Sequence, residues 1–151
     1  MKKYSNSDFS FVLPDEWACR DESDASMQLS VFECPDAASR VTVSLRRYAP
    51  ETPHSDVAES FSEFVRIRRS AEVDVCDSPD DLVLTPEEIV NGGDYLYCKY
   101  AGIHGPQDRR LAALLTAENG KMLCFYVESS GTSDDYFNSL ANSIFDSIEV
   151  F

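Results

Sequence analysis

Two largely apolar stretches, Arg109–Ala117 and Lys121–Ser129, are joined by a short turn that contains Asn119 and Gly120. Asn and Gly both accept the positive backbone φ that a tight hairpin turn requires, and together they are a strong hairpin signal. The segment therefore predicts two adjacent antiparallel strands. Because a lone hairpin is at best marginally stable in water, other parts of the chain must complete a sheet around it.

Further strands are predicted where apolar and polar residues alternate between Pro, Gly or Asn residues. They are Phe9–Leu13, Met27–Glu33, Arg40–Tyr48, Leu82–Val90 and Asp94–Tyr100. The second and third of these are expected to pair as a hairpin. Asn91-Gly92-Gly93 is another hairpin turn signal and lies between the last two. The apolar end of the chain, Ile148–Phe151, is interpreted as a short edge strand, and Gly102–Pro106 as a loop.

Two segments change to the period of an amphipathic helix. The first follows Pro53, where Ser55 can act as the N-cap, and carries an apolar stripe of Val57, Phe61, Phe64 and Val65. Arg66, Arg68 and Arg69 are expected in its last turn, where they would complement the helix dipole and neutralise part of the acidic segment that follows. The second helix is expected to begin near Thr132 or Ser133, and its apolar stripe comprises Tyr136, Phe137, Leu140, Ala141, Ile144 and Phe145.

The order of these elements predicts an α+β fold for residues 1–151 as a single domain. We expect a central antiparallel sheet of about six or seven strands with two helices packed against it, in the order β-β-β-α-β-β-β-β-α. The chain has 151 residues and 43% hydrophobic residues, which is enough for a folded core despite a formal net charge of -14.

Eight carboxylates and no Lys or Arg lie between Ser70 and Cys98. They are Glu72, Asp74, Asp77, Asp80, Asp81, Glu87, Glu88 and Asp94. Like charges this close repel each other, and natural chains keep such a cluster for solvation, for a cation or for a basic partner. We predict that these side chains form a partner-binding surface, with Tyr95 and Tyr97 as aromatic anchors. Asp77–Asp81 is also the most loop-like segment and the one candidate for local disorder.

Charge and hydropathy argue against several kinds of partner. A strongly acidic chain is repelled by nucleic-acid phosphates and by anionic membranes, so we expect neither as a partner. The polar start of the chain, Met1–Asp8, lacks the apolar region of a secretory signal, and no run reaches the length of a membrane span. The five cysteines are odd in number and include no C-x-x-C motif, which favours free thiols. We therefore expect a cytoplasmic protein.

No motif indicates catalysis, a metal or a cofactor. His54 and His104 are interpreted as exposed turn residues because neither lies near a nucleophile signature. Asp77, Asp80 and Asp81 do not match a calcium loop, because Pro79 interrupts them and the central Gly is missing. One member of Arg109-Arg110 is expected to pair with a neighbour in the sheet such as Glu33 or Glu128. We expect no enzymatic activity, no metal and no cofactor.

Several short segments together resemble a known family. They are Phe9-Ser-Phe-Val-Leu-Pro-Asp-Glu-Trp17, Leu29-Ser-Val-Phe32, Val41-Thr-Val-Ser-Leu45 with the helix after it, and Phe145-Asp-Ser-Ile148. This arrangement resembles the DcrB-related, PsbP-like family. The resemblance implies an α/β sandwich and a binding function, because that family includes lipid-anchored periplasmic proteins, photosystem subunits and cytoplasmic Eag chaperones of type VI secretion.

Two functions follow as expectations. The first is a bacterial immunity protein that neutralises a cognate secreted toxin, because an acidic surface can occlude the basic cleft of an enzyme that attacks nucleic acid. The second is an Eag-like adaptor that shields the hydrophobic segment of a secreted effector, which requires an apolar groove and usually a homodimer. In both cases the partner is another protein.

Overall fold

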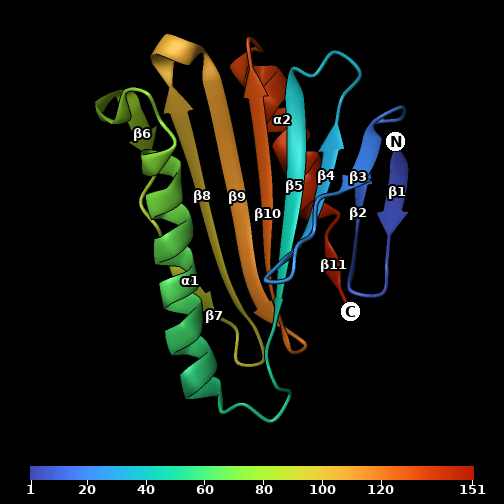
Figure 1. Cartoon of the computed structure of the whole chain (residues 1–151), viewed down its shortest axis with the longest axis vertical. Coiled ribbons are helices and arrows are strands. Elements are labelled where there is room, and N and C mark those ends of the chain that lie inside the picture. Colours follow the sequence, from blue (N-terminus) through green and yellow to red (C-terminus); the bar gives the residue numbers. More distant parts are fainter.

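An antiparallel sheet of eight strands forms the centre of the computed structural model, which describes residues 1–151 (Figure 1). The strands are β3 Ala18–Asp21, β4 Gln28–Glu33, β5 Ser39–Arg47, β6 Leu82–Leu84, β7 Ile89–Asn91, β8 Leu96–His104, β9 Arg109–Glu118 and β10 Lys121–Ser130. Their order across the sheet is β3-β4-β5-β10-β9-β8-β6, and β7 also pairs with β8. The hairpin recognised in the sequence, β9–β10, therefore lies at the centre of the sheet.

A second, smaller sheet brings the two ends of the chain together. It contains β1 Lys2–Ser5, β2 Phe9–Leu13 and β11 Glu149–Val150, in the order β1-β2-β11. The predicted strand Phe9–Leu13 thus belongs to this sheet and lies across one face of the main one. Its aromatic side chains explain the position, because the Phe9 ring lies 5.5 Å from that of Phe125 on β10, between centroids.

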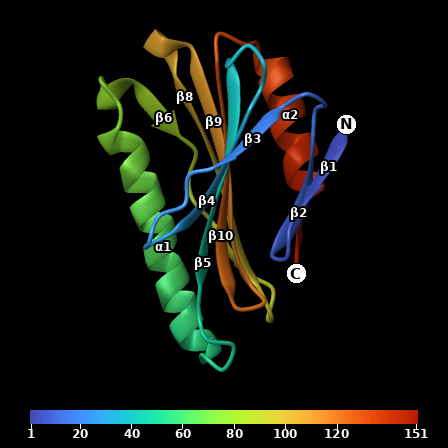
Figure 2. The same ribbon diagram turned by 45° about the vertical axis from the view of Figure 1, so that its right-hand side comes forward.

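The molecule has three layers, which Figure 2 shows from the side. Helix α1, His54–Asp74, covers one face of β8, β9 and β10, and helix α2, Asp134–Asp146, covers the other face together with the small sheet. Alternation along β10 supplies both cores, because Leu123 and Phe125 face α2 whereas Cys124 and Tyr126 face α1. The predicted α+β fold with both helices packed against an antiparallel sheet is confirmed.

The turn residues behave as predicted. Asn119 and Gly120 have φ values of 53° and 77°, the positive pair that a type I′ hairpin turn requires. In the β7–β8 turn, Gly93 has a φ of 92° and donates its N–H to Asn91 Oδ1 at 2.9 Å. Helix α2 begins after Ser133, whose Oγ accepts the Tyr136 N–H at 3.1 Å. The predicted hairpins and the α2 cap are confirmed.

Helix α1 differs from the prediction at both ends. It begins at His54 behind Pro53, with no side-chain cap, so Ser55 is not the N-cap. It continues to Asp74, and Arg66, Arg68 and Arg69 therefore precede its last turn, which contains Glu72 instead. No Gly or Pro interrupts the segment before Pro79, so nothing in the local sequence ends the helix earlier.

The edge of the sheet next to α1 also differs from the prediction. The expected strand Leu82–Val90 is two short strands, β6 and β7, which pair with opposite ends of β8. Strand β8 runs on to His104, through the expected loop at Gly102. A Cβ at Gly102 would lie 2.6 Å from Leu84 Cδ2 and 3.2 Å from Leu111 Cγ, so glycine leaves room for these two side chains.

We predict that Phe125→Ala destabilises the protein by about 3–5 kcal/mol, because it empties a fully buried site that contacts two other phenylalanine rings. Urea denaturation measures the change in the free energy of unfolding. Val83→Ala is the control, since Val83 is largely exposed and its truncation should change that free energy by less than about 0.5 kcal/mol. Equal effects of the two changes would contradict the proposed core.

Candidate functional site

Seven of the eight predicted carboxylates belong to the segments beside the β8 edge of the main sheet, which run from the end of α1 through β6 and β7 and are shown in Figure 1. Asp74 ends α1, and Asp77, Asp80 and Asp81 lie in the connection to β6, which includes the 3-10 turn η1, Pro79–Asp81. The remaining three, Glu87, Glu88 and Asp94, flank β7. Strand β8 has nine residues, so this edge is about 30 Å long at about 3.3 Å per residue. The carboxylates therefore form an extended line rather than one compact patch, and we call these seven side chains the acidic edge.

Most of the acidic edge has no cationic partner within the molecule. Glu87 Oε2 lies 3.2 Å from Arg69 Nε, and Asp77 accepts a hydrogen bond from Gln107 Nε2 at 3.3 Å. The other five carboxylates, Asp74, Asp80, Asp81, Glu88 and Asp94, are exposed and form no ion pair. The expected neutralisation by the arginines of α1 is thus limited to Arg69, because Arg66 pairs with Glu63 on the same helix.

Glu72 does not belong to this surface, and its assignment to the partner-binding set is corrected. Its residue is 4% exposed, and the carboxylate points from α1 onto the sheet. Arg109 Nη2 lies 3.3 Å from Glu72 Oε2, and the Tyr126 hydroxyl donates to the same oxygen at 3.2 Å. A buried carboxylate with two internal partners cannot contact another protein.

Arg109 joins Glu72 to a second carboxylate, Glu128. Arg109 Nη2 lies 3.3 Å from Glu128 Oε2, which confirms the predicted pairing of an arginine from Arg109-Arg110 with Glu128. Arg40 on β5 pairs with Glu128 from the other side. The result is a row of alternating charges across the sheet, Arg40–Glu128–Arg109–Glu72, that ends on α1. Burial raises the pKa of Glu72, and the neighbouring Arg109 and the Tyr126 hydroxyl oppose this rise.

Two carboxylates, a tyrosine and an arginine are also a set that catalytic sites use, so access matters here. A hollow of about 200 Å³ reaches Arg40, Arg109 and Glu128 but not Glu72. Glu72 Oε2 and Glu128 Oε2 both accept from Arg109, and both lie within hydrogen-bond distance of the Tyr126 hydroxyl, which can donate to one of them at a time. With these donors in place, the arrangement fastens the end of α1 to the sheet.

His104 fixes the start of the acidic edge, and its assignment as an exposed turn residue was wrong. The side chain ends β8 and is 1% exposed. Its Nε2 lies 3.0 Å from Ser78 Oγ and 3.2 Å from the Ser78 carbonyl oxygen, just before η1. The buried ring therefore ties the segment with Asp77, Asp80 and Asp81 to the sheet. His54 is exposed, as predicted.

Tyr95 and Tyr97 lie beside the acidic edge, at the start of β8. Their rings are stacked with centroids 6.1 Å apart, and they face the α2 side of the sheet. They line a hollow of about 330 Å³ whose other walls include Phe145, Ile148 and Val150. The same hollow contains Lys99, whose Nζ lies 5.6 Å from the centre of the Phe145 ring.

This hollow is the first of three that follow β8 alongside α2. The middle one, of about 230 Å³, shares Lys99 and Phe145 with it. The third, of about 330 Å³, shares Ala101 and Phe137 with the middle one and extends to Val83. Together they form a groove between the open face of β8 and helix α2, which we call the β8–α2 groove. Sequence patterns could not reveal it, because it depends on where α2 crosses the sheet.

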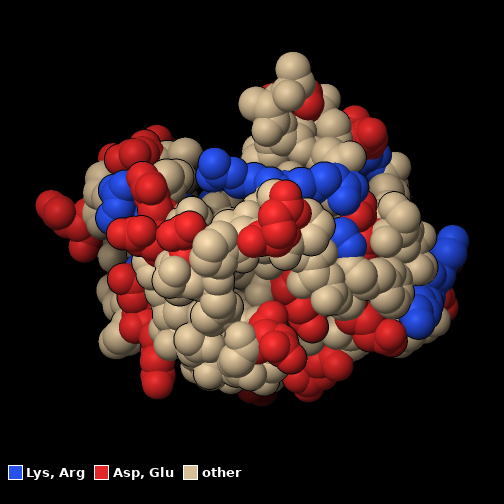
Figure 3. Space-filling model, turned by 90° about the horizontal axis from the view of Figure 1, so that it is seen from below, with Lys and Arg blue, Asp and Glu red and all other residues tan.

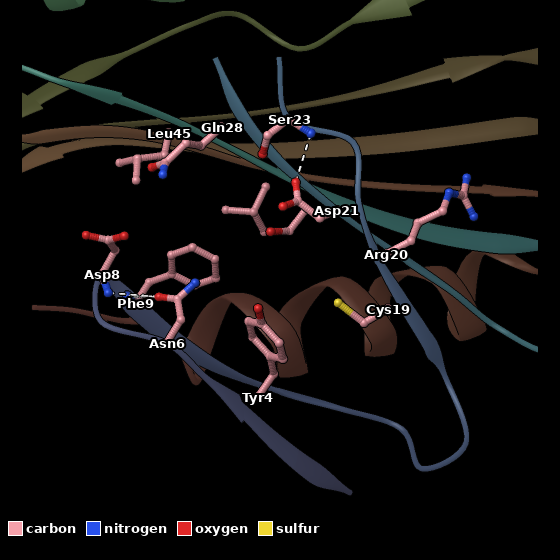
Figure 4. A pocket seen from close by; sticks show the side chains of 12 residues that line it. Tyr4, Asn6, Asp8, Phe9, Cys19, Arg20, Asp21, Ser23, Gln28 and Leu45 are labelled. Carbon is pink, nitrogen blue, oxygen red and sulfur yellow. Dashed lines mark hydrogen bonds between the residues drawn. The ribbon is translucent and has the colours of Figure 1, made fainter. Parts of the chain in front are cut away.

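A separate cavity of about 220 Å³ lies between the small sheet and β3–β5 (Figure 4). Tyr4, Asn6 and Asp8 line it from one side, and Cys19 and Asp21 from the other. Its two carboxylates already have partners within the chain, since Asp8 binds Arg47 at 3.0 Å and Asp21 accepts the Ser23 N–H at 2.8 Å. Burial raises the pKa of the Cys19 thiol, which keeps it in the neutral and less reactive form.

Carboxylates are not confined to the acidic edge. Figure 3 shows the end of the molecule that carries the β5–α1 and β9–β10 connections, where acidic side chains are scattered and basic ones form a band. No group of three His, Cys, Asp or Glu side chains is arranged to hold a metal ion, and no helix is long and apolar enough to cross a membrane. All five cysteines are free thiols, and Cys98 and Cys124 are buried. On the acidic edge, Arg69 is the one cation that forms an ion pair, with Glu87.

Comparison with known proteins identifies the fold. The structure is similar to cyanobacterial PsbP (CyanoP) of Synechocystis sp. PCC 6803, with a TM-score of 0.68 and 18% sequence identity over 99% of this chain and 92% of that protein. It is also similar to LpqN of Mycobacterium tuberculosis, which is involved in cell envelope biogenesis, with a TM-score of 0.50 and 11% identity over 94% of this chain and 82% of that one.

A more distant match is a protein of Bacteroides thetaiotaomicron VPI-5482, with a TM-score of 0.42 and 11% identity over 95% of this chain and 45% of that one. No protein-family model and no curated protein matches the sequence. The chain therefore has a PsbP-like fold, as the sequence resemblance implied. At these identities the likeness concerns the fold alone.

We predict that Arg109→Leu destabilises the protein by about 3–5 kcal/mol, because it leaves the buried carboxylate of Glu72 without its cation. Arg66→Leu is the matched control, since Arg66 pairs with Glu63 on the exposed surface of α1 and should contribute less than about 1 kcal/mol. The free energies of unfolding from urea titrations at pH 7 provide the comparison. Equal losses would show that the buried row of charges does not hold α1.

Glu72→Gln should change how stability depends on pH. Because the pKa of Glu72 is raised in the folded state, the folded protein retains a proton that the unfolded chain has already released. The contribution of this group to the free energy of unfolding therefore falls as pH rises from the unfolded pKa through the folded one. Gln cannot ionise, so this fall should be absent. Urea titrations at several pH values between about 4 and 8 measure it, and unchanged curves would contradict the assignment.

Proposed function

We propose that this protein is a non-catalytic protein-binding domain that docks its acidic edge onto a basic surface of another protein. In its most specific form, it is a cytoplasmic immunity protein that neutralises a cognate secreted toxin by occluding the toxin's site. The observation that carries the proposal is the set of five exposed carboxylates on this edge that form no ion pair within the molecule. Electrostatic repulsion among them lowers stability, and a basic partner would relieve it.

The layout of the charges favours rapid association. Exposed, unpaired carboxylates contribute little to the affinity of a finished complex, but they attract a cationic surface from a distance and raise the association rate constant. Toxins that act on nucleic acids or nucleotides carry basic clefts that bind phosphates. An edge about 30 Å long, with Tyr95 and Tyr97 at one end, can cover such a cleft with competing charge.

A specific observation also favours a second function. The β8–α2 groove is lined by Tyr97, Phe137, Phe145 and other apolar side chains, and it runs beside the acidic edge. An Eag-like adaptor of the DcrB-related family would use such a groove to shield a hydrophobic segment of an effector. The two functions differ in what they require. The adaptor needs a long apolar ligand and a homodimer, whereas the immunity protein needs a basic partner and acts as a monomer.

Reversal of three charges on the acidic edge tests the first function. We predict that Asp77→Lys combined with Asp80→Lys and Asp81→Lys slows association with the partner about tenfold or more at low salt, because the steering field changes sign there. The partner is sought among the products of neighbouring genes. Each product is expressed alone and together with this protein, and the partner is the one that arrests growth only when it is expressed alone. Stopped-flow mixing at several salt concentrations then measures the association rate.

The control variant carries Asp15→Lys, Glu16→Lys and Glu22→Lys, which change the net charge equally but flank β3 at the opposite edge of the sheet. It should retain most of the wild-type association rate. If both triple variants slow association equally, net charge rather than the acidic edge is responsible. If neither does, the proposed surface is wrong.

A further inference from the structure

One end of the β8–α2 groove exposes apolar side chains that the fold does not use. Val83 on β6 and Ile103 on β8 are direct cross-strand partners and are 70% and 50% exposed. Both face the α2 side of the sheet, yet α2 does not reach them. Two large aliphatic residues paired on an open face gain little burial from the fold, and where they adjoin a hollow they offer an apolar contact surface.

The adjoining hollow is the third one of the groove, of about 330 Å³, and we call it the Val83 pit. Phe137 and Asn138 of α2 form one wall, and Val83 and Ile103 form the other. The small side chain of Ala101 lies between them and leaves the space open. The volume is near the lower limit for pockets that take small ligands, so the pit suits one large side chain rather than a whole molecule.

The rim of the pit is negatively charged. Arg110 follows Ile103 in the same row across the sheet, and it pairs with both Asp108 at 2.8 Å and Asp134 at 2.5 Å. Arg110 thus balances the charge of one of these two carboxylates and leaves the other unbalanced. Asp80 and Asp81 directly precede β6, the strand that carries Val83, and have no ion pair. An apolar pit with an anionic rim is complementary to an apolar side chain flanked by lysines or arginines.

We infer that the Val83 pit receives a single leucine-sized or aromatic side chain from a basic segment of the partner protein. This inference rests on the proposed function and deepens it. It names the position at which a partner attracted by the acidic edge would be bound. The flanking Lys or Arg residues pair with Asp80, Asp81 and the unbalanced carboxylate at Arg110. The buried side chain then supplies affinity that exposed charges cannot, as anchor residues do at the centre of other interfaces.

Synthetic peptides provide the test. One eleven-residue peptide carries a central leucine between lysines, a second has alanine in place of the leucine, and a third has glutamates in place of the lysines. Titration of the intact ¹⁵N-labelled protein gives the dissociation constants and the positions of the shifted amides. We expect the leucine peptide to bind about tenfold or more tightly than the alanine peptide, the glutamate peptide not to bind, and the shifts to centre on Val83, Ala101 and Ile103.

Two variants separate the pit from the charges. Ala101→Leu fills the pit without changing any charge, so it should abolish the preference for leucine over alanine. Ala18→Leu places the same change on the exposed strand β3 and should preserve that preference. The double variant Asp80→Lys with Asp81→Lys should weaken the binding of both lysine-containing peptides by a similar factor. Thermal denaturation of each variant verifies that it is folded.

The outcomes distinguish failure of the pit from failure of the proposed function. Equal binding of the leucine and alanine peptides, or an unchanged preference in Ala101→Leu, overturns the pit while the acidic edge stands. Shifts centred on Tyr95 and Tyr97 also overturn it and favour the adaptor function. If neither lysine peptide binds, or if the Asp80 and Asp81 reversals change nothing, the acidic edge itself fails.

Discussion

Unequal coverage of strand β8 is the constraint on which the candidate site depends. Helix α1 buries Leu96, Cys98 and Tyr100 on one face of this strand, but α2 lies over the middle of the sheet and leaves Lys99 and Ile103 on the other face exposed. The β8–α2 groove and the Val83 pit are the space between α2 and this uncovered face. The acidic edge lies beside the groove because the return from α1 to β8 must follow the same edge of the sheet.

The sequence predicted what depends on local geometry. Turns at Asn119 and Gly120, the Ser133 cap and the alternation of β10 all act within a few residues of one another, so their patterns are visible in the chain. It could not predict which polar groups are buried. Glu72 and His104 look like surface residues until the fold brings Arg109 and Ser78 against them, 37 and 26 residues away. That long-range pairing has no sequence signature without the register of the sheet.

The internal pairs also explain why most of the acidic edge is left without cations. The chain has fewer arginines than carboxylates, and most of the arginines form ion pairs within the sheet or at its ends. Arg40 and Arg109 form the row of alternating charges with Glu128 and Glu72, and Arg110 pairs with Asp108 at the start of β9. The buried carboxylate of Glu72 needs its cation, because without one it carries the cost of desolvation. The exposed carboxylates of the edge carry a much smaller cost in water, so nothing in the fold requires their neutralisation.

The shape of this edge determines how a partner can bind. An open edge strand usually recruits another strand through its free backbone groups. Here β6 and β7 have three residues each, Pro86 between them lacks an N–H, and Arg69 Nη1 donates to the Thr85 carbonyl at 2.9 Å. These features prevent the addition of a strand. The partner that we propose would therefore be recognised through side chains, which include the carboxylates of the acidic edge and the apolar pair Val83 and Ile103.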